Sequence, residues 1–484
     1  MTWVRAMANR RFGAVIIVFA TGLGLTGCAS WSQPRAGPAE GVRSQEVVPA
    51  TWSVTTPTSV TTKPIGEWWA RFNDPLLSTL VQRSLQYNTD IRTAQAALRQ
   101  ARALRDVQAA TLYPSTDVST SAQRSKSIEE KTRHTYAAGF DAAWEIDVFG
   151  ANRSGLRAAE ADARASAASL ADTQVSIAAE VALAYIQVRG TQARLDIARE
   201  NLATQLETLQ ITNWRLQAGL TTSLDVEQAR TTSEQTRAQI PVLEISIAQA
   251  ENSLAVLTGQ SPADLKKQLQ ETAVVPSPAD DLAVSMPAET LRQRPDVRAR
   301  EHQVSAARAL VSQAEAARYP AFLLNGSFGL QALTFSALTG AASTVSALVG
   351  SVSMPLFDGG ANRARIRAQD AVLEQAWVSY EAQILTALQE VEDALVALNG
   401  DRERLVSLRN AAEAAGNAAL LARQRYTSGL IDFQVVLETQ RTLLNTQDSV
   451  ASTTADVSTD YVRLYKALGG GWQPDAAPRE PWTP

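Results

Sequence analysis

TYAAGFDAAWEIDVF, residues 135–149, alternates between two kinds of side chain. The even positions are apolar and include Tyr136, Phe140, Trp144 and Ile146. The odd positions include Asp141, Glu145 and Asp147. Successive side chains of a β-strand point to opposite faces, so this segment has one apolar face and one polar to acidic face. Strands of about 10 residues with this pattern are typical of transmembrane barrels. We therefore expect the three acids in a barrel lumen.

Three further segments show related alternation. They are STDVSTSAQRS at 115–125, FLLNGSFGLQAL at 322–333 and LVGSVSMPLF at 348–357. Four strands cannot close a barrel, and an open edge in lipid leaves backbone amides unpaired at several kcal/mol each. Two chains would give eight strands around a packed interior, whereas three would give twelve strands around a water-filled path. The acidic inner face favours three chains. A soluble hairpin packed on a helix is the alternative.

Two very long helices are expected beside these strands. Residues 151–213 contain no proline and only two glycines, and they are rich in strong helix formers. Residues 361–427 have the same character. About 60 residues at about 1.5 Å each make a rod of roughly 90 to 100 Å, which a globular domain does not require. A dimeric coiled-coil tether would share this length, but it does not account for the strands.

The chain also repeats itself. Tyr113-Pro114 corresponds to Tyr319-Pro320 at an offset of 206 residues, and Gly219-Leu220 corresponds to Gly429-Leu430 at an offset of 210. Such matches indicate an internal duplication. We predict two copies of about 205 residues, each with a helix, two strands, a very long helix, a turn and a return helix. The expected boundaries are 66–270 and 271–475, with a proline-rich linker near 259–287 and a flexible tail at 476–484.

The amino terminus is typical of an export signal. Three arginines precede an apolar run of roughly 14 residues, which is shorter than the about 20 residues that span a bilayer. Leu25-Thr26-Gly27-Cys28 then resembles the lipobox of bacterial lipoproteins and holds the only cysteine. We expect a signal peptide at 1–27, acylation of Cys28 with palmitate among its chains, and a lipid-anchored, extended tether at 28–65. By analogy with lipoprotein sorting, Ala29 favours the outer membrane.

Composition argues against several function classes. The net charge is −4 and there is no basic run, so we expect no nucleic-acid partner. The two histidines, His134 and His302, lie about 170 residues apart and have no matching catalytic partner. No phosphate-binding loop, metal-ligand cluster or activated nucleophile is recognisable. We therefore predict no enzyme activity, no cofactor and no metal site.

Four motifs resemble the TolC/OprM outer membrane efflux protein family, specifically its lipoprotein branch of the NodT type. They are WWARFNDPLL, LRQRPDVRAREHQV, SMPLFDGGANRARI and RYTSGLIDFQVVLETQRTLL. The resemblance implies an α+β membrane protein: a homotrimer with a 12-stranded β-barrel in the outer membrane, on a tunnel of long antiparallel α-helices in the periplasm. It also implies a channel of a tripartite multidrug pump, working with a periplasmic membrane-fusion adaptor and an inner membrane transporter of the resistance-nodulation-division (RND) class.

The resemblance further places a gate at the periplasmic tip. Gly219 and Gly429 suit the left-handed backbone of the tip turns. Tyr426 falls at the tethering tyrosine of the family and Glu438 at an aperture acid. The family's second aperture acid and its tethering arginine are replaced by Val435 and Ile431. Asp432 and Asp225 are nearby acids that would compensate.

Two other functions stay open at this point. A duct for polypeptide secretion or metal export would share the same architecture, and a purely structural envelope lipoprotein would share the long helices. The cargo cannot be deduced from the sequence, because selection in such pumps lies mainly in the inner membrane transporter.

Overall fold

The computed structural model describes residues 49, 51–52, 65–126, 132–271, 273–278 and 287–472. The expected signal peptide, Cys28, most of the tether and the expected tail lie outside the described residues. The chain divides into two units, Met1–Glu46 and Val47–Pro484. The architecture below is that of the second unit.

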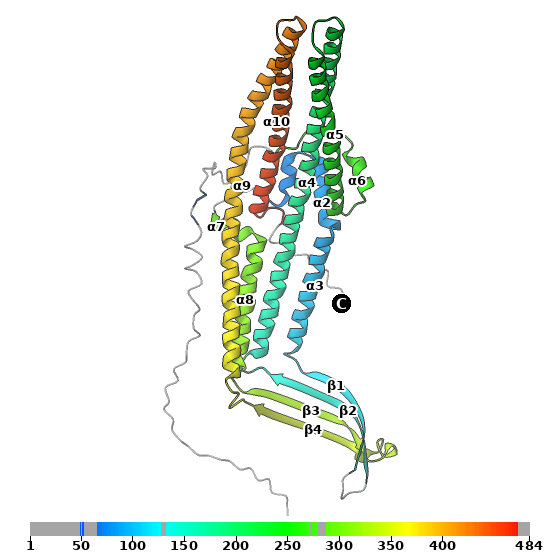
Figure 1. Ribbon diagram of the computed structural model, residues 1–484. Helices are drawn as coiled ribbons and strands as arrows, with labels where there is room; N and C mark the ends of the chain where they lie inside the picture. Colours follow the sequence, from blue (N-terminus) through cyan, green and yellow to red (C-terminus); the bar gives the residue numbers. More distant parts are fainter. Residues whose placement is uncertain are drawn as a thin grey trace, which may run out of the picture. The chain divides into compact units, whose positions relative to one another are not determined.

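The described strands form one antiparallel sheet in the order β1-β2-β3-β4 (Figure 1). Their bounds are β1 Ser115–Ser125, β2 Arg133–Ile146, β3 Ala321–Ala332 and β4 Thr344–Ser353. The register pairs Val118 with Phe140 and Phe140 with Phe328, so the apolar side chains of neighbouring strands share one face. Strands β1 and β4 are exposed along their whole length. The sheet therefore has two open edges.

Two strand ends differ from the sequence prediction. The strand expected at 348–357 lies earlier, at Thr344–Ser353. Met354 and Leu356 follow it, because Pro355 has no N–H to donate to a ladder. β2 ends at Ile146, so Asp147 lies beyond the sheet.

The two long helices, α4 (Ala151–Gln217) and α9 (Ala361–Thr427), have 67 residues each. At about 1.5 Å per residue each is roughly 100 Å long. The described residues contain no helix that is both long and apolar enough to cross a membrane.

Both long helices end in the same turn. Gly219 and Gly429 have φ values of 72° and 73°. The N–H of Leu220 donates to the Arg215 carbonyl at 2.8 Å, and the N–H of Leu430 donates to the Arg425 carbonyl at 2.9 Å. This 6→1 hydrogen bond past a left-handed glycine closes the helix and reverses the chain. The return helices are α5 (Ser223–Thr258) and α10 (Phe433–Ala467).

Shorter helices complete the two halves. They are η1 Ile65–Phe72, α2 Pro75–Tyr87, α3 Thr89–Ala110, α6 Pro262–Leu269, α7 Pro287–Gln293, α8 Pro295–Ala316, η2 Phe335–Ala337 and η3 Ala341–Ser343. Part of the expected linker is thus helical, because Ser261 caps α6 and Pro262 begins it.

The long helices form an open array rather than a closed bundle. α4 packs against α3, α5, α8 and α10, whereas α9 packs against α8 and α10. Figure 1 shows the order α5-α4-α10-α9 near the turns and α3-α4-α8-α9 near the sheet. The array therefore has α3 and α5 at one edge and α9 at the other. Exposed apolar side chains lie along both edges, among them Leu104, Val107, Val242, Ile245, Val378, Leu385 and Val396.

The largest hydrophobic core lies midway along the array. It joins η1, α2 and α6 to the long helices, and Trp68 stacks on Tyr465 with ring centroids 5.4 Å apart. Asp74 caps α2 by accepting the Leu77 N–H at 2.9 Å, and its other oxygen accepts the Tyr185 hydroxyl at 2.7 Å. Burial, aided by that hydrogen bond, raises the pKa of Tyr185 to about 12. This core fixes the array between its two ends.

Candidate functional site

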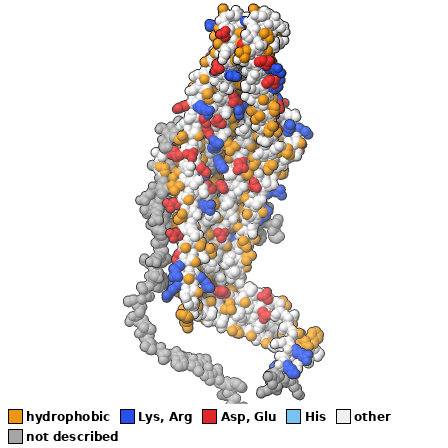
Figure 2. Space-filling model, in the orientation of Figure 1, with side chains coloured by type: hydrophobic (Ala, Val, Ile, Leu, Met, Phe, Trp, Pro, Cys, Tyr) orange, Lys and Arg blue, Asp and Glu red, His pale blue; other side chains and the backbone are white. Residues whose placement is uncertain are grey.

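Two regions collect the candidate functional residues. The first, called the turn region here, is where α4, α5, α9 and α10 end or begin around Gly219 and Gly429. The second, called the Arg294 cavity, lies between α4, α8, α9 and the end of α10. On the face shown in Figure 2, acidic and basic side chains are mixed along the helices without a large patch of one sign.

Tyr426 lies inside the turn region. Its side chain is 4% exposed, and its ring lies 5.3 Å from that of Phe433 between centroids. The apolar cluster around it comprises Ala229, Ala422, Phe433, Val436 and Leu437. The sequence analysis placed Tyr426 at a tether of the aperture. In the structure the helices of both hairpins enclose it, and the tether role stays a prediction.

Arg215 joins the two hairpins at this cluster. Its guanidinium lies 4.5 Å from the Tyr426 ring centroid, and Nη1 donates to the Tyr426 carbonyl at 2.6 Å. That carbonyl belongs to the last turn of α9, where the helix dipole favours a positive charge. A guanidinium over an aromatic face adds a cation–π attraction. One side chain of α4 therefore holds the end of α9.

Further links between the hairpins lie along the same seam. They are Arg423–Glu207 at 2.7 Å, Gln440–Thr208 at 2.9 Å, Asn201–Gln447 at 2.7 Å and Arg194–Asp448 at 2.7 Å. Gln440 and Thr208 are buried, so their hydrogen bond is shielded from water. These contacts connect α4 to α9 and α10 over the half of the array nearest the turns.

The acids expected at the gate have three different environments. Asp225 caps α5: it accepts hydrogen bonds from the Thr221 hydroxyl at 2.6 Å and from the Thr222 N–H at 3.0 Å. Burial opposes its ionisation, but these bonds outweigh burial and lower the pKa of Asp225. Asp432 precedes α10, is exposed and makes no capping hydrogen bond. Glu438 is exposed at a cavity of about 160 Å³ between α5 and α10, lined also by Gln228 and Arg441.

The acids expected in the lumen are not equivalent. Asp141 lies on the polar face of the sheet, directly opposite Asp117 of β1, and accepts the Ser119 hydroxyl at 2.6 Å. Glu145 lies on the same face. The prediction that Asp147 faces the lumen is wrong. Its carboxylate accepts the N–H groups of Asn152 and Arg153 at 3.3 and 2.9 Å and so stabilises the start of α4. Asp117 also belongs to the acidic face. The sequence analysis did not predict it, because the alternation in its strand is weak.

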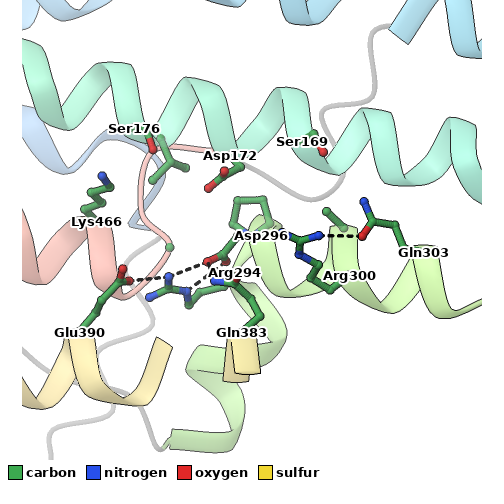
Figure 3. Close-up of a pocket in the computed structure, with 14 residues that line it drawn as sticks. Ser169, Asp172, Ser176, Arg294, Asp296, Arg300, Gln303, Gln383, Glu390 and Lys466 are labelled. Atoms are coloured by element: carbon green, nitrogen blue, oxygen red, sulfur yellow. Dashed lines mark hydrogen bonds and ion pairs between the residues drawn. The ribbon is translucent and has the colours of Figure 1, made fainter. Parts of the chain in front are cut away.

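The Arg294 cavity has a volume of about 320 Å³ and is lined mainly by polar groups (Figure 3). Arg294 donates to Asp296 at 2.6 Å, to Glu390 at 2.6 Å and to the Ala467 carbonyl at 2.8 Å. Burial opposes its charge, but the two carboxylates outweigh burial and raise the pKa of Arg294. The guanidinium thereby clamps α9 and the end of α10 to the start of α8.

Asp172 faces the same cavity from α4 (Figure 3). Burial and the nearby negative charge of Asp296 raise the pKa of its carboxyl, against the opposing charges of Arg294 and Lys466. The cavity holds charges of both signs.

The histidines lie apart. His134 is in β2 opposite Arg124, and His302 is half-buried on α8, where burial lowers its pKa. Within the described ranges, no group of three or more His, Cys, Asp or Glu side chains is placed to hold a metal ion.

Arg215, Glu207, Arg423 and Arg294 were not singled out from the sequence. Arg294 belongs to the RPDV motif, which drew notice only as a family marker. Arg215 and Glu207 lie on a long polar helix among other charged residues, and only the pairing of α4 with α9 distinguishes them.

Comparison with known proteins agrees with this architecture. The family model described as "Outer membrane efflux protein" matches residues 80–260 and 286–470. The toluene efflux pump outer membrane protein TtgF of Pseudomonas putida is 32% identical over 413 residues, covering 84% of this chain and 85% of that protein. Nodulation protein T of Rhizobium leguminosarum bv. viciae is 30% identical over 422 residues, covering 87% of both. The solved structure of the outer-membrane channel OprN superimposes with a TM-score of 0.84 at 36% identity, covering 88% of this chain and 98% of that one.

Proposed function

The chain belongs to the outer membrane efflux protein family, and we propose that it exports small apolar organic molecules. Members of this family are outer membrane exit ducts of tripartite efflux pumps, and this chain is such a duct. The duct spans the outer membrane and extends into the periplasm, and such channels work with adaptors and inner membrane transporters.

One observation carries the assignment to a duct. Both layers of the chain, the sheet β1-β2-β3-β4 and the helix array above it, are open at both edges. Copies placed side by side would join β4 to a neighbouring β1 and α9 to a neighbouring α5, closing both layers around one axis. The polar face of the sheet then lines a continuous aqueous path, in which Asp117, Asp141 and Glu145 meet water.

The relatives support an apolar cargo. TtgF is a toluene efflux pump channel, and SrpC of Pseudomonas putida, 31% identical over 409 residues, is a solvent efflux pump channel. We infer an RND-class transporter and a membrane-fusion adaptor as the partners of this chain.

Complementation tests this proposal. The protein is produced in a bacterial strain that lacks its own efflux channels, together with an RND transporter and its adaptor. We expect restored growth in the presence of toluene. Growth that stays at the level of the empty strain, although the channel reaches the outer membrane and conducts ions in planar bilayers, would contradict the cargo proposal.

We propose that the turn region is the periplasmic gate. The contacts of Arg215 and the four further links described above tie hairpin α9–α10 to hairpin α4–α5 within one chain. Among them, Arg215 lies nearest to the turns. Releasing these contacts lets the ends of α9 and α10 move away from α4. Asp432 and Glu438 are the exposed acids that such a movement would bring to the aperture or remove from it.

Single-channel recording tests the gate. Arg215→Ala removes both the hydrogen bond to the Tyr426 carbonyl and the cation–π contact, so we expect ion conductance in planar bilayers to rise severalfold. Arg237→Ala is the matched control, because Arg237 is half exposed and pairs only with Glu234 at 2.6 Å on its own helix. Equal conductance in wild type and Arg215→Ala would contradict the assignment.

We also propose that Cys28 carries the lipid anchor and that the repeats span 66–270 and 271–475. The corresponding order of strands, long helix, turn and return helix in the two halves supports the second statement. Mass spectrometry of the membrane-extracted protein tests the first: we expect an amino-terminal, triacylated Cys28. An unmodified cysteine would contradict it.

A further inference from the structure

Three carboxyl groups act on one another electrostatically where α10 packs on α9, about two to three helical turns before α10 ends. They are Asp401 of α9 and Asp456 and Asp460 of α10. Asp460 is only 1% exposed. Its Oδ1 accepts the Arg463 guanidinium at 3.2 Å, whereas its Oδ2 is buried and accepts no hydrogen bond from the described residues.

The fold itself does not require these acids. The corresponding positions of the first half, 210 residues earlier, are Thr191, Ser246 and Ala250. Helices α4 and α5 pack against each other without any of the three charges. The three acids are therefore a feature of the α9–α10 contact that the corresponding α4–α5 contact lacks.

The cations around Asp460 are engaged elsewhere or exposed. Arg402 of α9 donates to the Tyr461 hydroxyl, and Arg404 of α9 lies 3.5 Å from Asp401. Arg194 of α4 pairs with Asp448 at 2.7 Å and otherwise acts on Asp456. Arg463, on the same helix as Asp460, has a side chain that is 62% exposed, so its charge is screened by water.

Burial, together with the neighbouring negative charge of Asp401, raises the pKa of Asp460 to about 6. A hydrogen bond between two carboxyl groups requires a proton on one of them, because two carboxylates have no donor. The native state therefore binds this proton more tightly than an extended chain, whose aspartates have a pKa near 3.8. The contact is most stable below about pH 4 and weakens as pH rises through about 6.

We propose that Asp401 and Asp460 form a proton-sensitive contact between α9 and α10, joined by one shared proton in mild acid and pushed apart by two negative charges at neutral pH. Both ends of α10 are held by other contacts, Arg294 to Ala467 at one end and Gln440 to Thr208 toward the other. Losing the proton therefore weakens the packing of α10 on α9 locally, between the Arg194–Asp448 and Arg294–Ala467 contacts. This consequence rests on the proposed role of the α9–α10 hairpin in gating.

Infrared titration of the purified, detergent-solubilised protein tests the contact without reference to transport. We expect a protonated carboxyl band that disappears with a midpoint near pH 6 in wild type and is absent in Asp460→Asn. Asp401→Asn removes the neighbouring charge, so the midpoint should fall toward the ordinary aspartate range. It also serves as the second variant if Asp460→Asn does not fold. A wild-type spectrum with no carboxyl titrating between pH 5 and 7 would overturn the proposal.

Conductance tests the link to the gate. In planar bilayers we expect wild type to open more often at pH 7.5 than at pH 5, and Asp460→Asn to stay at the wild-type pH 5 level at both. Asp393→Asn is the control, since Asp393 is an exposed acid of α9 that accepts only Gln389 at 3.2 Å. Wild-type pH dependence in Asp460→Asn would overturn the link. A channel silent at every pH would instead contradict the duct, while the infrared result would stand.

Discussion

Arg294 is a buried residue that binds two carboxylates and one backbone carbonyl. It is 6% exposed and neutralises two acids while holding the last carbonyl of α10. Removing one partner of a fully buried ion pair costs about 3 to 5 kcal/mol, and the cost here is smaller because Glu390 is half exposed. Arg294→Ala should therefore lower the thermal midpoint of the solubilised protein by several degrees.

Arg423→Ala is a fair comparison for Arg294→Ala, since Arg423 forms an ion pair between helices in which both side chains are partly exposed to water. Exposed pairs contribute only about 0 to 1 kcal/mol. Scanning calorimetry of the two variants checks the difference. Equal midpoints in both would show that the Arg294 clamp does not stabilise the fold.

Glu438 is the acid whose exposure fits an aperture. Glu438→Ala removes one negative charge per chain, so we expect higher ion conductance in planar bilayers and a weaker preference for cations over anions. Asp225→Asn is a useful contrast, because Asp225 is engaged in capping α5. Conductance and cation preference that match wild type in Glu438→Ala would refute its place at the aperture.

Sequence patterns predicted single residues best where backbone geometry decides. Gly219 and Gly429 adopt the left-handed conformation that their place after a helix suggests. Tyr426 is packed between helices, and its role as a tether stays a prediction. Alternation misled for Asp147, which accepts N–H groups at the start of α4 instead of facing a lumen. The Arg215–Tyr426 contact joins residues far apart in sequence, and no local pattern marks it.

At the scale of elements, alternation located the strands and proline set their ends. The 115–125 strand agrees with β1, and Pro355 explains why β4 ends before the predicted residue. Helix composition predicted α4 and α9, but it could not show that α6 forms within the proline-rich linker. A capping Ser261 and the burial of Leu265 and Leu269 stabilise this short helix.

Gly139 and Gly329 face each other in the β2–β3 ladder. A Cβ at Gly329 would lie 2.6 Å from the Ala138 carbonyl oxygen and 2.6 Å from the Gly139 Cα, both of which are backbone atoms. Overpacking of this kind costs about 1 to 3 kcal/mol. We expect Gly329→Ala to reduce the amount of folded protein in the outer membrane.

Gly350→Ala is the matched control in the neighbouring strand β4, because a Cβ there meets nothing within 4 Å. Heat-modifiable migration on gels would report the folded fraction of both variants. The steric explanation fails if Gly329→Ala and Gly350→Ala fold to the same extent.

At the scale of the whole molecule, one chain leaves both its sheet and its helix array open at the edges. Its sheet exposes both edges, and its helix array ends in exposed apolar side chains at α5 and α9. The acidic face of the sheet predicted a water-filled path, but the sequence could not predict which helices lie side by side. The array α5-α4-α10-α9 follows from packing between halves.

Native mass spectrometry of the detergent-solubilised protein tests the central claim, that copies of this chain close both layers together. We predict a particle of three chains, with a mass about three times that of one chain and no substantial monomer. A folded, stable monomer with intact sheet and helix signals by circular dichroism would contradict it.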